Sequence, residues 1–120
     1  MADPQRISCD MIDDDVAVVQ FKDRKILDEG AIQDLGRELF GLVEEAKHKK
    51  ILLDFTNVEF LSSAALGKLI SMHKKVEQAE GKLEMCSIRP EIYDVFKITR
   101  LNEKFDIYDD RDTALGAFRA

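Results

Sequence analysis

Apolar residues recur with two different periods along this chain, one typical of strands and one typical of helices. Short alternating or continuous apolar runs predict strands at residues 7–12, 16–21, 51–55, 83–88 and 105–108. The third run, Ile51-Leu52-Leu53-Asp54-Phe55, is almost wholly apolar, which is typical of a central strand covered on both faces. The acidic segment Asp13-Asp14-Asp15 separates the first two runs and predicts a turn there.

Between the later strands, apolar residues recur at the spacing of amphipathic helices, and this period predicts four of them. The first helix begins after Asp28, whose carboxylate is suited to accept the free amide hydrogens of the first turn. The second ends at Glu80-Gly81, where we expect Gly81 to take the left-handed conformation. Pro90 is expected at the first position of the third helix, and Asp112 is expected to cap the last one.

The predicted elements follow one another in the order β-β-α-β-α-β-α-β-α, which indicates an α/β fold. Alternating strands and helices form right-handed crossovers and place successive strands in parallel. The expected sheet is therefore mostly parallel, with four to five strands, and the two opening strands add an antiparallel edge at its N-terminal side. No repeat, linker or change of composition divides the chain, so residues 1–120 are predicted to form a single domain.

The composition narrows the classes of protein that fit this fold. Of the 120 residues, 45% are apolar and 35% are charged, which excludes disordered and low-complexity chains. The net charge of -6 argues against nucleic acid and anionic membrane as partners. No apolar run reaches the roughly 20 residues that span a bilayer, and the first residues do not resemble a signal peptide. We therefore expect a cytoplasmic protein, with Cys9 and Cys86 as buried, reduced side chains.

No arrangement of residues in the sequence is typical of catalysis. Glycine-rich nucleotide motifs, zinc-protease motifs and closely spaced cysteine pairs are missing. His48 lies in a basic segment expected to be solvated, and His73 is expected to pack beside apolar residues, so neither is predicted to bind metal. A turn is favoured over a magnesium site at Asp13-Asp14-Asp15, because such a site needs carboxylates at the carboxyl ends of parallel strands. We expect no enzymatic activity, no cofactor and no metal.

One segment, residues 57–69, carries a specific signal. Ser62 and Ser63 start the second helix soon after the central strand, and small residues follow them. The carboxyl end of a parallel sheet is where α/β proteins tend to place their sites, and a helix N-terminus tolerates an anion such as phosphate. The segment therefore predicts either a phosphorylatable, protein-binding surface or only a serine cap with close helix packing. The residues by themselves leave both interpretations open.

This segment resembles the signature of STAS domains, in particular that of the bacterial anti-sigma-factor antagonists. The segments that carry the resemblance are Leu53-Asp54-Phe55, Val58-Glu59-Phe60, residues 62–67, residues 81–90, residues 95–107 and Ile26-Leu27-Asp28. In element order the similarity covers approximately residues 7–118. It implies a STAS-like fold in which the helices pack mainly on one face of the sheet.

The resemblance also implies roles for individual residues. The phospho-acceptor serine of the family falls on Ser63, while Ser62 replaces the acidic residue before it and is the fallback acceptor. The second serine and the glycine of the family fall on Ala64 and Ala65, and Arg100 replaces a glycine. The residues expected to bind a partner are Asp28, Asn57, Glu59, Phe60, Leu61, Ser62, Ser63, Ala64, Ala65 and Lys68.

The function implied by the resemblance is that of an anti-sigma-factor antagonist, which regulates transcription indirectly. Its expected partner is an anti-sigma factor that is also a serine kinase, and phosphorylation would switch the binding off. A serine phosphatase is a further partner that the resemblance implies. Two alternatives stay open: a STAS module that scaffolds a signalling complex without switching, as the missing acidic residue allows, and a STAS module that binds a nucleotide or other small ligand at the same helix terminus.

Overall fold

The computed structural model describes residues 6–119, and all the predicted strands and helices are present in that range. The strands are β1 (Ile7–Ile12), β2 (Val16–Phe21), β3 (Lys25–Ile26), β4 (Lys50–Asp54), β5 (Phe60–Leu61), β6 (Lys82–Cys86) and β7 (Asp106–Tyr108). The helices are α1 (Glu29–Glu44), α2 (Ser63–Gln78), α3 (Pro90–Ile98), α4 (Leu101–Lys104) and α5 (Arg111–Arg119).

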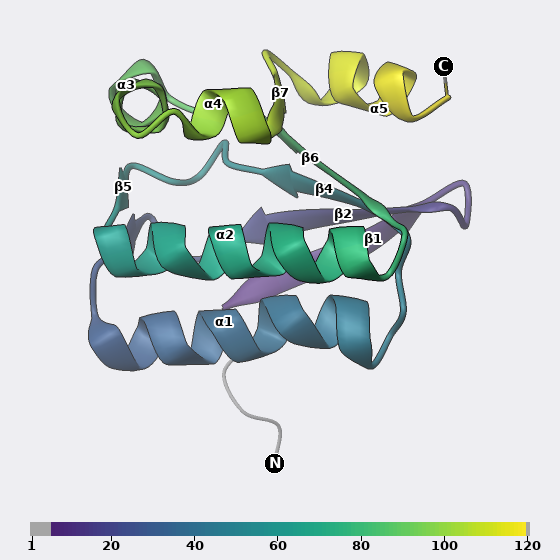
Figure 1. The fold of residues 1–120 in the computed structure, drawn as a ribbon, viewed down its shortest axis with the longest axis horizontal. Coiled ribbons are helices and arrows are strands. Elements are labelled where there is room, and N and C mark those ends of the chain that lie inside the picture. The colour runs from purple at the N-terminus through teal and green to yellow at the C-terminus, as the bar shows by residue number, and fades with distance from the viewer. Residues whose placement is uncertain (1–5, 120) are drawn as a thin grey trace.

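The longer strands form one sheet in the order β1-β2-β4-β6-β7 (Figure 1). β1 pairs antiparallel with β2, and the remaining neighbours pair in parallel. Parallel neighbours need a crossover connection, and α1, α2 and the pair α3–α4 each lie in one of these crossovers. The predicted α/β fold, with a mostly parallel sheet and an antiparallel N-terminal edge, is therefore confirmed.

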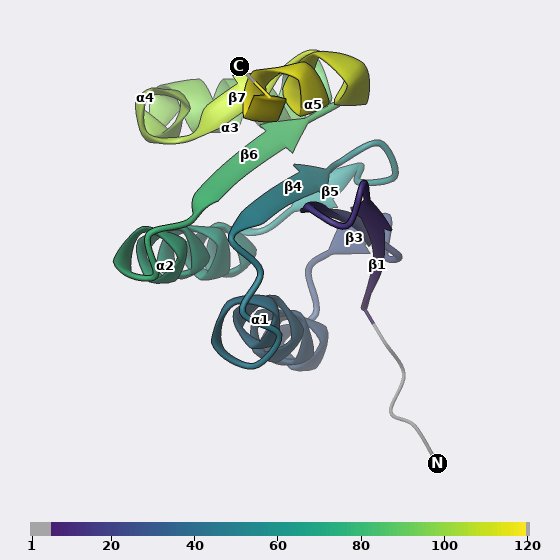
Figure 2. The same ribbon diagram turned by 90° about the vertical axis from the view of Figure 1, so that its right-hand side faces the viewer.

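Helices cover both faces of the sheet, but unequally. α1 and α2 lie on one face and α5 lies on the other (Figure 2). The larger core fills the space between the sheet and the first two helices, where Leu39, Leu53 and Leu69 are almost completely buried. A smaller apolar cluster beneath α5 contains Ala114 and Phe118. α3 and α4 also bury their apolar residues in the larger core, so the structure agrees with the expected packing of most helices on one face.

Three short elements were not predicted from the pattern. β3 and β5 form a parallel pair of two residues each, with Lys25 opposite Phe60 and Ile26 opposite Leu61. α4 has four residues, about one helical turn. Segments this short contain no complete apolar period, so their conformation depends on the elements around them. The β3–β5 pair matters most, because it joins the segment after β2 to the segment after β4.

The predicted helix caps are correct at two of the three starts. The carboxylate of Asp28 accepts a hydrogen bond from the amide of Ala31 (Oδ2···N 3.0 Å), and Pro90 is the first residue of α3. The prediction for the last helix is wrong, because the cap is Asp110, whose Oδ1 accepts a hydrogen bond from the amide of Thr113 at 2.8 Å. α5 begins before Asp112, so that residue lies inside the first turn.

The prediction for Gly81 is also wrong. Glu80, not Gly81, has the left-handed conformation at the end of α2, with φ 60°. The amide of Gly81 donates to the carbonyl oxygen of Val76, which closes the helix end as a Schellman-type motif. A glycine is required at position 81 for space instead, because a Cβ there would lie 2.7 Å from the carbonyl oxygen of Lys49.

The Gly81→Ala substitution is therefore expected to destabilise the protein by about 1–3 kcal/mol, because the added methyl group meets backbone that cannot move freely. Chemical denaturation measures this as a lower free energy of unfolding. Gly116→Ala is the matched control, since a Cβ at that helical position meets nothing within 4 Å. It is expected to keep or slightly raise the stability. Equal stabilities of the two variants would contradict the steric explanation.

The remaining polar predictions have mixed outcomes. The acidic segment after β1 forms a turn, as predicted, with Asp13 and Asp14 at φ 55° and 54°. His73 packs edge-on against Phe105, with ring centroids 5.1 Å apart, also as predicted. Cys86 is buried, but the prediction that Cys9 is buried is wrong. Cys9 lies on β1, an edge strand with one neighbouring strand. The alternation of apolar and polar residues therefore wrongly predicted that the Cys9 side chain is buried.

Candidate partner-binding site

The candidate site begins with residues 55–62, the segment that connects the end of β4 to the start of α2. Phe55 and Val58 in this segment are fully buried, and the amide of Val58 donates to the carbonyl oxygen of Phe55 (N···O 2.9 Å). Further along, the amide of Ser62 donates to the carbonyl oxygen of Ile26 at 3.1 Å. These contacts hold the start of α2 beside the segment that precedes α1, at the left end of the molecule in Figure 1.

The two serines at the start of α2 have different environments. Ser62 is the N-cap residue and is half-buried, and its hydroxyl oxygen accepts a hydrogen bond from the amide of Ala65 (3.2 Å). Ser63 is the first residue of the helix and is exposed, as is Ala64. Ala65 is 0% exposed, so the prediction that it contacts a partner is wrong. A protein that approaches from solvent therefore meets the side chain of Ser63 before that of Ser62.

The electrostatics of this helix end favour an added anion. The N-terminus of a helix carries a partial positive charge, and no acidic side chain lies in the first turn of α2. In contrast, α1 has Asp28 as its cap and Glu29 in its first turn. A negative charge near the start of an exposed helix typically stabilises it by about 0.3–1 kcal/mol. A phosphate group on Ser63 would therefore be compatible with α2.

A first groove runs between α1 and α2, and its volume is about 490 Å³. Its lining residues are Leu27, Glu29, Ile32, Gln33, Ser62, Ala64, Gly67, Lys68 and Ser71. The Nζ of Lys68 lies 3.3 Å from the Oε1 of Gln33, so Lys68 links the two helices. Its aliphatic stem packs over Gly36, where a Cβ would lie 2.8 Å from the Cδ of Lys68. Lys68 is thus part of the groove wall.

A second groove, of about 360 Å³, is formed by β5, α2 and α3. Its lining residues are Glu59, Phe60, Leu61, Leu66, Arg89, Glu91, Ile92 and Val95. Phe60 is 59% exposed and Val95 is 39% exposed, while Leu27 in the first groove is 54% exposed. Large exposed apolar side chains therefore lie in both grooves next to the start of α2, which is typical of a protein-binding surface.

Sequence reasoning missed the contribution of α3 to this surface. The helix buries only Ile92 and Phe96, yet Val95 and Ile98 are also apolar. The sequence contains one indication of this contribution, since the short helix has more apolar positions than one buried stripe needs. The second groove itself could not be inferred, because it depends on how α3 is placed relative to β5.

Two of the residues predicted to bind a partner also hold the segment in place. The Nδ2 of Asn57 donates to the carbonyl oxygens of Phe21 (3.2 Å) and Lys22 (3.1 Å), which ties the segment to the end of β2. The carboxylate of Glu59 accepts a hydrogen bond from the Nε of Arg24 at 2.7 Å, and this bond lowers the pKa of Glu59. Glu59 is therefore ionised at neutral pH at the edge of the second groove.

Asp54, the last residue of β4, is a buried carboxylate that holds the start of residues 55–62 in place. It is only 4% exposed and accepts hydrogen bonds from the Thr56 amide (2.9 Å), the Thr56 hydroxyl (2.5 Å) and the Nη2 of Arg111 (2.7 Å). Burial by itself raises the pKa of Asp54, but the hydrogen bonds from Thr56 and Arg111 outweigh it, so the pKa is lowered. The ionised carboxylate thus joins β4, the start of the segment and α5.

Within residues 6–119, no group of three or more His, Cys, Asp or Glu side chains is placed to hold a metal ion. No helix in this same part of the chain has the length and apolar character needed to cross a membrane. The candidate site consists of an exposed hydroxyl group at a helix N-terminus, with an apolar groove on either side of that helix end.

Several known proteins are similar to this chain. A model of the STAS domain family matches residues 12–114. BtrV of Bordetella bronchiseptica, which is named as an anti-sigma factor antagonist, is 28% identical over 87 residues, or 72% of this chain and 74% of that protein. An anti-sigma-factor antagonist (STAS) domain protein of Planctomyces limnophilus has a TM-score of 0.84, with 23% identity over 95% of this chain and 98% of that one. The phosphorylated form of Bacillus SpoIIAA has a TM-score of 0.71, with 15% identity over 95% and 99% of the two chains.

Proposed function

The chain belongs to the STAS domain family, and we propose that it acts as an anti-sigma factor antagonist, which binds an anti-sigma factor and so regulates transcription indirectly. The observation that carries this proposal is the exposed Ser63 at the start of α2, with exposed Leu27 and Phe60 in the grooves beside it. The similarity to BtrV supports it. The proposed docking face consists of Leu27, Asp28, Glu59, Phe60, Leu61, Ser63, Ala64 and Val95.

Binding at the docking face draws its free energy mainly from apolar side chains. Leu27, Phe60 and Val95 are exposed in the free protein, and a partner that covers them removes apolar surface from water. The small side chain of Ala64, one position after Ser63, leaves room for the backbone of a partner to approach α2. Asp28 and Glu59 supply negative charges at the edge of the face.

The partner in this proposal is a serine kinase as well as an anti-sigma factor, and it phosphorylates Ser63. A phosphate adds about -1.5 to -2 charges in the middle of the docking face, near Asp28 and Glu59. Repulsion by these carboxylates and the loss of solvent around the phosphate both oppose the complex. Each 1.4 kcal/mol of this penalty lowers the affinity about tenfold, so a modest electrostatic cost is enough to release the partner.

Ser63 is the preferred acceptor, and Ser62 is the fallback. The hydroxyl oxygen of Ser62 accepts a hydrogen bond from the amide of Ala65 and is half-buried, so phosphorylation there would disturb the cap of α2. A lost serine cap costs a helix about 1 kcal/mol. Ser63 is exposed and carries no such role, which makes its modification compatible with the fold.

The proposal is tested with the protein that co-purifies with the chain. We expect an anti-sigma factor, and we expect the addition of ATP to release it. Ser63→Ala should prevent both phosphorylation and release, whereas Ser62→Ala should permit both. Phosphorylation of α2 in the Ser63→Ala variant at the wild-type rate would contradict the assignment of Ser63 as the phosphorylated residue. Heat from a calorimetric titration with nucleotides alone would instead favour the small-ligand alternative.

Replacing Phe60 with Ala is expected to weaken partner binding by about 2 kcal/mol, or roughly 30-fold, because central aromatic side chains dominate such interfaces. The free energy of unfolding should change little, since Phe60 is 59% exposed in the free protein. Met11→Ala is the control, because Met11 is also exposed (42%) but lies on β1, outside the docking face. Equal effects of both substitutions on affinity would rule out the second groove as a contact.

A further inference from the structure

Glu84, in the middle of β6, is a buried acidic side chain outside the docking face. It is 0% exposed, and within residues 6–119 neither of its carboxylate oxygens has a hydrogen-bond partner. The Nζ of Lys82 lies 3.4 Å from one of these oxygens, but the Lys82 side chain is itself 50% exposed. Burying a carboxyl group without hydrogen bonds is costly, and it is far more costly when the group is ionised. The folded structure therefore favours the neutral form of Glu84.

α5 covers the face of the sheet to which Glu84 belongs (Figure 2). Side chains alternate along a strand, so Glu84 shares its face with Cys86, which lies in the apolar cluster beneath α5. α5 has nine residues and buries only Ala114 and Phe118. The Nζ of Lys82 lies 6.0 Å from the centroid of the Phe118 ring, so the last turn of α5 and Glu84 are close to the same lysine.

The two ends of α5 are held with different strength. Arg111 at its start contacts the buried Asp54 at 2.7 Å, and Asp110 caps the first turn. Arg119 at its end pairs with Asp13, but these side chains are 62% and 70% exposed, and such surface pairs contribute only about 0–1 kcal/mol. No strand follows α5 in the described part of the chain, so α5 can separate from the sheet without breaking strand pairing.

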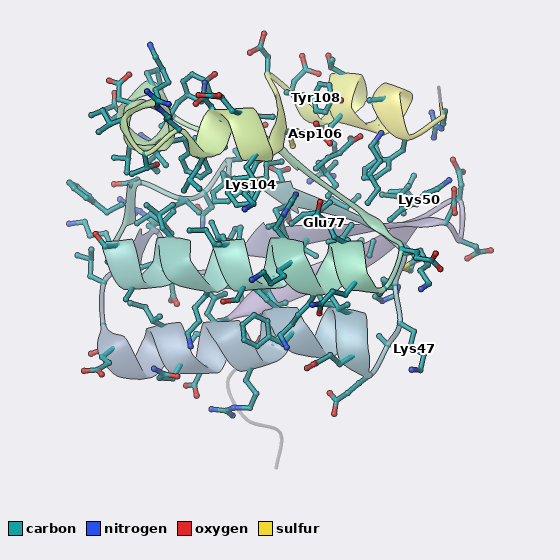
Figure 3. The ribbon with its side chains drawn as sticks, viewed as in Figure 1. Lys47, Lys50, Glu77, Lys104, Asp106 and Tyr108 are labelled. Carbon is teal, nitrogen blue, oxygen red and sulfur yellow. The ribbon has the colours of Figure 1, made fainter. Side chains whose placement is uncertain are left out.

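The elements next to Glu84 carry several charged or titratable groups. These are Lys82 on β6, Asp106 and Tyr108 on β7, Lys50 at the start of β4, and Arg111, Asp112 and Arg119 on α5. Figure 3 shows Asp106 and Tyr108 beside α5, and Lys50 toward the β1–β2 turn, where it pairs with Asp15 at 2.8 Å. Burial raises the pKa of Glu84, Lys82 partly opposes this, and Asp106 adds to it.

We propose that α5 is a pH-controlled lid that stays closed over Glu84 while this carboxyl group is protonated and separates from the sheet along its whole length when the group ionises. An ionised carboxylate gains more from water than a neutral carboxyl group does, so ionisation shifts the equilibrium toward the open lid. Opening also uncovers Cys86. The lid is independent of the proposed function, because no residue of the docking face takes part in it.

The direction of the pH effect follows from linkage. In the open state Glu84 titrates near the ordinary value of about 4.3, and in the closed state it titrates at a higher pH. The closed lid is therefore most favoured below the open-state pKa. As the pH rises between the two values, the open fraction increases about tenfold per pH unit. Above the closed-state pKa the increase levels off.

Cys86 provides the readout, because it is buried beneath α5 whereas Cys9 is exposed. In a Cys9→Ser background, reaction with dithiodipyridine measures how often Cys86 becomes accessible. We expect the ratio of this rate to that of the Cys9→Ser/Glu84→Gln variant to rise by more than about twofold from about pH 4.5 to about pH 7. The ratio cancels the titration of the thiol itself, whose pKa burial raises to about 11. A ratio constant within about twofold over this range would overturn the proposal.

Three further variants make the test specific. Glu103→Gln removes an exposed acidic charge on α4 and is expected to react like the Cys9→Ser parent. Lys82→Met removes the neighbouring cation, raises the closed-state pKa further and should extend the rise to higher pH, which tests the lid even where Glu84→Gln does not fold. Val76→Cys, in a Cys9→Ser/Cys86→Ala background, reports on the main core beneath α2. It should stay protected while Cys86 reacts, and parallel reaction of both sites would mean global unfolding and exclude a lid.

Discussion

Replacing Ser63 with Glu is expected to lower the affinity for the anti-sigma factor about 100-fold, or about 2.7 kcal/mol. The new carboxylate lies in the middle of the docking face, where Asp28 and Glu59 already contribute negative charge. A partner that covers Phe60 excludes water from the same region, and an unpaired charge in such an interface costs several kcal/mol. Enzymatic phosphorylation should have a larger effect, because a phosphate carries about -1.5 to -2 charges.

Isothermal titration calorimetry with the purified anti-sigma factor measures this change. Gln78→Glu is the matched control, because it adds the same charge at the other end of α2, outside the docking face. Its affinity should stay within about twofold of wild type. Ser63→Ala should bind as the wild type does, since it adds no charge. Wild-type affinity of the Ser63→Glu variant would favour the scaffold alternative, in which the chain binds a partner without switching.

Replacing Asp54 with Ala is expected to lower the free energy of unfolding by about 3 kcal/mol at neutral pH. Asp54 is 4% exposed and accepts hydrogen bonds from Thr56 and Arg111, so its removal leaves several donors without their acceptor. The loss also detaches the start of α5 from the end of β4. Chemical denaturation measures the change. Asp112→Ala is the control, because this exposed residue of α5 should shift the stability by no more than about 0.5 kcal/mol.

The contribution of Asp54 should also depend on pH. Its pKa is lower in the folded protein than in the unfolded chain, so the unfolded chain takes up a proton first as the pH falls. The stabilisation is therefore fully present above the unfolded pKa of about 3.9 and is lost as the pH falls through the folded pKa. The difference in stability between wild type and the Asp54→Ala variant should shrink over that acidic window. A difference that does not change with acid would contradict the ionised state assigned to Asp54.

The local elements of this protein follow closely from its apolar pattern. β1 and β2 have the predicted bounds, and the predicted cap at Asp28 is present, because alternation and capping depend on neighbours in the sequence. The predictions that failed depended on distant parts of the chain. Gly81 is needed because the backbone at Lys49 lies against it, and Cys9 is exposed on an edge strand that has a neighbouring strand on one side only.

The candidate site also has features that follow from local sequence and features that depend on distant parts of the chain. Ser62 and Ser63 could be located at the start of a helix after a central strand, since strand, connection and helix are contiguous in sequence. The half-buried Ser62 lies next to the pair β3–β5, where its amide donates to the carbonyl oxygen of Ile26, and this pair joins residues about 35 positions apart, as in the Lys25–Phe60 pair. The second groove depends on α3, which returns to β5 only after β6 has entered the sheet.

The sequence by itself determined the order of strands and helices, the parallel sheet with its antiparallel edge, and the serine pair at the start of α2, because each of these follows from periods and caps within short stretches of chain. Only the tertiary structure decided that Ser63 is exposed between two apolar grooves and that Glu84 is buried beneath α5 without hydrogen bonds. Burial and charge environment are set by residues far apart in sequence, and these meet only when the sheet and its helices pack together.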